Sequence, residues 1–111
     1  MENGIERKEV VASVELEIDL KEIYQYSLET FGNRVADEYL DRMKKAIRLL
    51  GVQYSMHAEC WQLETKRKIY RRVIVQSHII IYRIAERIEV LRVFHSASSN
   101  TKIRSARKVK I

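Results

Sequence analysis

Several residue types are scarce or missing in this sequence, and each absence narrows the class of protein. There is no proline, glycine occurs only at positions 4, 32 and 51, and no internal repeat or low-complexity block divides the 111 residues, so we expect one domain. The single cysteine, Cys60, excludes an internal disulfide and suits a reducing compartment. No apolar run reaches the roughly 18 residues that span a membrane, and the polar, acidic N-terminus is not a secretory signal. We therefore expect a cytoplasmic globular protein.

Acidic residues are scarce in the second part of the chain. Residues 66–111 contain 13 Lys or Arg and 2 Asp or Glu, a net charge of +11, whereas residues 1–65 contain 8 and 13, a net charge of −5. The two values sum to the +6 of the whole chain. This asymmetry predicts a surface for an anionic partner, either a nucleic acid or an acidic protein segment.

Two amphipathic helices are predicted in the acidic part. Ser13 can cap the first helix, Gly32 suits the residue that follows its end, and Asn33 can cap the second helix, which Gly51 closes. Because so few residues connect the two helices, we expect them to form an antiparallel helical hairpin. The apolar stripe of the first helix is Leu16, Leu20, Ile23, Tyr24, Leu28 and Phe31, and that of the second is Ala36, Tyr39, Leu40, Met43, Ile47 and Leu50.

Strands surround this hairpin in the sequence. Residues 8–13 predict a short strand, residues 52–65 a loop that Trp61 anchors to the core, and residues 85–87 a tight hairpin turn. Three further strands are predicted at 68–76, 78–84 and 88–95, where Ile, Val and Tyr are frequent. The order β-α-α-β-β-β predicts an α+β domain at 1–98, with the helical hairpin on one face of a small antiparallel sheet, and a basic tail at 99–111.

Arginines interrupt the predicted strands at Arg71, Arg72, Arg83 and Arg92. If Ile84 pairs with residue 88 across the last hairpin, Arg83 and Arg92 point to opposite faces, whereas a one-residue slip places them on one face. The sequence leaves this register open. Any single arginine can lie along the sheet with its stem buried, but four on adjacent strands indicate a basic surface that can grip phosphates or carboxylates.

Other chemical signals are weak. His95, at the end of the last strand, can serve as a general acid or as a structural end-stop, and we favour the latter. His57 and His78 have no Cys/His spacing typical of zinc sites around them, and Cys60 has no base beside it. Neither a glycine-rich phosphate loop nor a carboxylate pair is present. We therefore expect no metal and no cofactor.

Three segments together resemble the RelE/ParE superfamily of toxins from type II toxin–antitoxin modules, and ParE-type toxins most closely. Residues 19–43 are similar to the family's helical hairpin, residues 70–84 to its arginine-bearing strand and the H-x-x-x-Y-R strand after it, and residues 88–98 to its closing strand with a terminal His. The long hairpin favours the ParE side. The sequence HSASS after the last strand departs from the His-Gly-x-Arg-Asp of many relatives, and the basic tail is longer.

The resemblance implies a function and partners. It implies a plasmid-stabilisation toxin that inhibits DNA gyrase by binding and causes growth arrest until a cognate antitoxin neutralises it. We expect an acidic antitoxin segment to add a strand to the sheet or a helix to the apolar helical faces. The chain could form homo-oligomers, or hetero-oligomers with the antitoxin. The positions expected to bind the target or a nucleic acid are Lys66, Lys68, Arg71, Arg72, Arg83 and Arg92.

Two alternatives stay open at this point. In a RelE-like, ribosome-dependent mRNA endonuclease, Arg71, Arg83 or Arg92 would stabilise the phosphate, and Tyr82 or His95 would move protons. In a decayed toxin, only antitoxin binding would remain. We favour a protein without enzymatic activity, because no clustered acid and base stand out.

Overall fold

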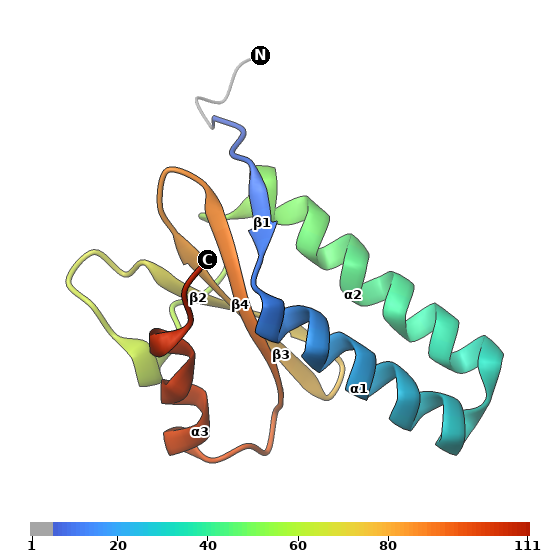
Figure 1. Cartoon of the computed structure of the whole chain (residues 1–111). Coiled ribbons are helices and arrows are strands. Elements are labelled where there is room, and N and C mark those ends of the chain that lie inside the picture. The colour runs from blue at the N-terminus through green and yellow to red at the C-terminus, as the bar shows by residue number, and fades with distance from the viewer. Residues whose placement is uncertain (1–5) are drawn as a thin grey trace.

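The computed structural model describes residues 6–111 and confirms the predicted α+β class (Figure 1). No helix in this range is long and apolar enough to cross a membrane. The predicted helices and strands are all present, with bounds that differ by a few residues. The elements are β1 (Val10–Ala12), α1 (Val14–Phe31), α2 (Asn33–Gln53), η1 (Trp61–Leu63), β2 (Tyr70–Val75), β3 (His78–Ile84), β4 (Ile88–His95), α3 (Asn100–Arg104) and η2 (Ser105–Lys108), where η marks a 3₁₀ turn.

The sheet is mixed rather than wholly antiparallel. Its strand order is β1-β4-β3-β2, and β1 runs parallel to β4, whereas the other two pairs are antiparallel as predicted. A parallel pair needs a long connection between its strands, and the helical hairpin with β2 and β3 supplies it. Because β1 has three residues, it covers only the first part of β4. The remaining edge of β4 faces α1.

The start of the helical hairpin agrees with the prediction from the sequence, whereas two later positions, Asn33 and Gly51, differ from it. Ser13 caps α1, and its hydroxyl accepts the Leu16 N–H at 2.9 Å. Gly32 ends α1 with φ +89°, a conformation that favours glycine. The prediction that Asn33 caps α2 is wrong, because Asn33 is already helical and makes no capping bond. Gly51 does not close α2; a Cβ there would lie 2.9 Å from the Lys8 carbonyl oxygen, so the glycine permits a close backbone approach.

Hydrophobic residues are buried on both faces of the sheet. The α1–α2 hairpin covers one face, where Ile80, Tyr82 and Val90 meet Leu16 and Met43. The segment that the sequence suggested as a basic tail forms α3 and η2 and covers the other face. There Ile103, Ala106 and Val109 pack with Ile79, Ile81 and Leu91. This second cover explains why both sides of the last two strands are apolar in sequence.

A β-bulge decides the open register. Ile84 pairs with Ile88, but the pairing shifts by one residue between Ile81 and Tyr82, so that Ile81 pairs with Arg92. The extra residue in β4 reverses the alternation of side chains beyond it. As a result Arg83 and Arg92 share the face covered by α3, although the turn itself has the register that would otherwise separate them.

Candidate functional site

The two arginines on this shared face are each held by a carboxylate. Arg83 Nε lies 2.7 Å from Glu89 Oε1, on the neighbouring strand. Arg92 forms a bidentate pair with Asp19 of α1, at 2.7 Å from Nε and 3.0 Å from Nη2. The hydrogen bond to Asp19 is the main cause that raises the pKa of Arg92. Both guanidinium groups therefore contribute to the fold in this structure, and they do not form one free basic surface.

Arg71 and Tyr82 hold the segment that connects α2 to β2. Arg71 donates from Nε to the Lys68 carbonyl at 2.8 Å and from Nη1 to the His57 carbonyl at 2.9 Å. The Tyr82 side chain is fully buried, its hydroxyl donates to the Tyr54 carbonyl at 2.6 Å, and burial raises its pKa. A buried tyrosine with a raised pKa is poorly placed to exchange protons with a substrate.

The remaining basic candidates lie elsewhere. Arg72 pairs with Ile81, so it points to the face covered by α3, where it is partly buried. Lys66 and Lys68 are exposed in the turn before β2. Among the described residues, the buried Nε of Arg72 has no hydrogen-bond partner. The fold therefore separates three strand arginines with structural contacts, Arg71, Arg83 and Arg92, from Lys66 and Lys68, which are exposed on a turn.

Trp61 does not anchor the connecting segment, contrary to the prediction. Its side chain is 59% exposed, and Cys60 and Leu63 on either side are buried instead. The 3₁₀ turn η1 directs these two neighbours into the core and leaves the indole outside. Periodicity over so short and irregular a segment carries no signal that distinguishes these positions.

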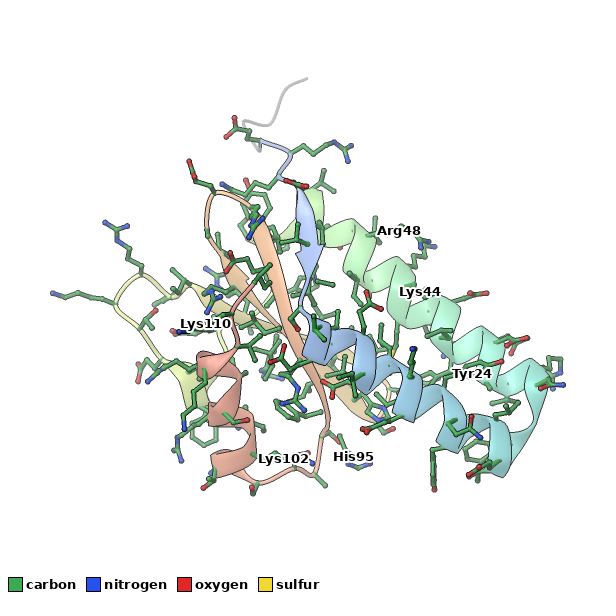
Figure 2. All side chains as sticks on the ribbon, in the orientation of Figure 1. Tyr24, Lys44, Arg48, His95, Lys102 and Lys110 are labelled. Atoms are coloured by element: carbon green, nitrogen blue, oxygen red, sulfur yellow. The ribbon has the colours of Figure 1, made fainter. Side chains whose placement is uncertain are left out.

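Two histidines face each other where β3 begins and β4 ends. His78 and His95 are direct cross-strand partners, with ring centroids 5.5 Å apart. The exposed His95 accepts the Ala97 N–H on Nδ1 at 3.0 Å (Figure 2). His78 Nδ1 lies 2.6 Å from the Tyr39 hydroxyl, and burial, with a smaller effect from His95, lowers the pKa of His78.

An apolar groove of about 330 Å³ opens beside His78. It lies between the α1–α2 hairpin, near the closed end that projects past the sheet (Figure 1), and residues 76–78 at the turn between β2 and β3. Its rim includes Tyr26 and Phe31, whose side chains are 65% and 61% exposed, together with Val35 and Tyr39. Helical periodicity places Phe31 in the apolar stripe of α1 and leaves Tyr26 out of it, because periodicity does not show where the sheet beneath a helix ends.

Among residues 6–111, no group of three or more His, Cys, Asp or Glu side chains is arranged to hold a metal ion.

Residues 10–99 match the family described as the ParE toxin of the type II toxin–antitoxin system parDE. The chain belongs to the ParE toxin family. The match covers the sheet and the helical hairpin and ends just before α3, so this ParE family member carries its C-terminal cover outside the matched region.

One related toxin and one solved structure of similar fold resemble the chain. Toxin ParE1 of Caulobacter vibrioides is 30% identical over 79 residues, which are 71% of this chain and 79% of that toxin. A solved structure of the chromosomal ParDE toxin–antitoxin system from P. aeruginosa matches with a TM-score of 0.66 at 14% identity. The match covers 80% of this chain and 96% of the solved one, and it supports the fold of this ParE toxin.

Proposed function

We propose that this ParE-type toxin acts in the cytoplasm by binding DNA gyrase and inhibiting it, without chemistry of its own. The proposal is supported by the pairing and burial of the residues that a nuclease would need. Arg83 and Arg92 are paired with carboxylates, and Tyr82 is buried. Phosphoryl chemistry requires cations and proton carriers that converge on one accessible point, and these three residues do not supply such a point.

A cognate antitoxin would neutralise the toxin by filling the groove beside the α1–α2 hairpin. Tyr26 and Phe31 present large aromatic surfaces there, and both are mostly exposed within the described residues 6–111. An amphipathic helix suits such a groove, because its apolar face can cover both rings while its polar face stays in water. An antitoxin as partner is supported by the family match and by the solved structure of similar fold, which is described as a toxin–antitoxin system.

Gyrase supercoiling and cleavage-complex assays with the purified protein test the target. We expect inhibition at micromolar protein, and no effect in either assay would refute gyrase as the target. DNA damage and protein synthesis are followed separately after induction in cells. Rapid loss of protein synthesis with intact DNA would point to mRNA cleavage instead.

Surface variants test the antitoxin site. Phe31→Asp and Tyr26→Asp place a charge on the groove rim, so we expect that co-expression with the protein encoded in the adjacent reading frame no longer restores growth. Ile18→Asp is the matched control, because Ile18 is an exposed apolar residue of the same helix that does not line the groove. Equal rescue of all three variants would exclude the groove as the antitoxin site.

A further inference from the structure

The C-terminal segment is the largest feature that the ParE family match does not account for. It begins after residue 99, where the match ends, and forms α3 and η2. Asn100 Oδ1 accepts a hydrogen bond from Gln62 Nε2 at 3.2 Å, and the Val109 carbonyl accepts one from Arg83 Nη2 at 3.4 Å. With Ile103 buried as well, the segment is fixed at both ends against η1 and the strands.

The outer surface of this segment is strongly basic. Residues 99–111 contain five Lys or Arg and no acidic residue, and the turn at 64–68 next to η1 adds three cations and one acidic residue, Glu64. Within residues 6–111, none of these eight cations forms an ion pair. We name this surface the basic C-terminal face; its exposed cations are Lys66, Arg67, Lys68, Lys102, Arg104, Arg107, Lys108 and Lys110.

An exposed tryptophan lies at this face. Trp61 begins η1, which packs against α3, and its neighbour Leu63 shares a buried cluster with Ile103 and Ala106. The Trp61 side chain is nevertheless 59% exposed. A large aromatic ring held in water beside unpaired cations is a common arrangement in surfaces that bind single-stranded nucleic acids, where rings stack on bases and cations contact phosphates.

We propose that the basic C-terminal face binds a single-stranded nucleic acid, with Trp61 stacked on a base and the cations on the phosphates. The flat indole favours this ligand over an acidic peptide, because every unpaired base offers a face for stacking. A duplex hides its base faces, and α3 has only five residues and is too short to read a groove. The proposal does not rest on gyrase inhibition, because its binding test contains no gyrase, and it concerns a different face from the groove proposed for the antitoxin.

The binding test uses the full chain and a labelled oligothymidylate of about 12 nucleotides. Fluorescence anisotropy gives the affinity at several salt concentrations, and quenching of Trp61, the only tryptophan, reports stacking directly. An oligouridylate of the same length distinguishes DNA from RNA as the source of the strand. A duplex and polyglutamate serve as competitors.

Two charge-reversal variants separate a local site from net charge. Arg104→Glu with Lys108→Glu alters the basic C-terminal face, and Lys44→Glu with Arg48→Glu alters α2, on the other side of the molecule in Figure 2. Each pair is spaced by four residues and changes the formal net charge from +6 by −4 to +2. We expect the first pair to weaken binding about tenfold or more and to reduce the salt slope by about 1.4, at roughly 0.7 per lost phosphate contact, while the second pair has little effect.

Trp61 variants test the stacking. Trp61→Ala should weaken oligothymidylate binding about 5- to 150-fold, the range that base stacking contributes, and Trp61→Phe should retain much of the affinity. Equal losses from the two charge-reversal pairs, absence of Trp61 quenching on binding, or competition by polyglutamate or duplex as strong as by the single strand would each overturn the proposal. Circular dichroism and thermal melting confirm that every variant is folded.

Discussion

The ion pair between Asp19 and Arg92 joins α1 to β4 where β1 no longer covers the strand. Asp19 is 7% exposed, and its carboxylate accepts two hydrogen bonds from Arg92 and a third from the Val93 N–H at 2.9 Å. Just before it, the Ser13 hydroxyl donates to the Leu91 carbonyl at 2.7 Å. Side chains of the α1 region thus replace the missing strand partner along this edge.

We predict that Asp19→Ala lowers the free energy of unfolding by about 3–4 kcal/mol. Removal of one partner of a buried ion pair costs about 3–5 kcal/mol, and the lower end applies because the Arg92 side chain is 25% exposed. The Val93 N–H also loses its acceptor, at about 1–3 kcal/mol if water does not replace it. Asp19→Asn retains an acceptor for that N–H and should cost about 2 kcal/mol.

Urea unfolding at neutral pH measures these values. Asp37→Ala is the matched control, since Asp37 is an exposed aspartate on α2 with one hydrogen bond, to the Tyr24 hydroxyl at 2.7 Å, and we expect it to cost less than about 1 kcal/mol. A loss below about 1 kcal/mol for Asp19→Ala, or equal losses for the alanine and asparagine variants, would refute the role of Asp19 as partner of the β4 edge.

Three further predictions concern stability. Gly51→Ala should destabilise the protein by about 1–3 kcal/mol, the usual cost of overpacking, because the new Cβ meets the Lys8 carbonyl oxygen; a gain in melting temperature, as helix propensity alone predicts, would contradict this. Ser13→Ala should cost about 1 kcal/mol or more by loss of the α1 cap, measured by urea unfolding. Burial lowers the pKa of His57 and His78 in the folded state, so the unfolded chain takes up protons first and stability should fall as the pH drops below about 6.5. His57→Gln should reduce this loss of stability at low pH. A His57→Gln protein whose stability falls with pH as much as that of the unchanged protein would contradict the prediction.

Much of this fold was predictable because local patterns reflect local surroundings. The helical stripes, the Ser13 cap, the strand runs and the tight turn at 85–87 all depend on residues a few positions apart. The charge asymmetry also follows from composition, although it does not place any cation. The parallel partner of β1 and the cover formed by α3 were not predicted, since both depend on contacts between residues far apart in the chain.

In the predicted site, too, local sequence predicted some features and contacts between distant residues decided the others. The sequence by itself determined that arginines would lie on adjacent strands and that a histidine would end the last one. Only the tertiary structure decided their state: one extra residue in β4 turned Arg92 to the face of Arg83, and α1 brought Asp19 to it across 73 positions. A single-residue change in register reverses every side chain beyond it, while the local composition stays the same. For this reason composition could indicate a basic half, but only packing separated the arginines that hold the fold from the exposed cations that form no ion pair.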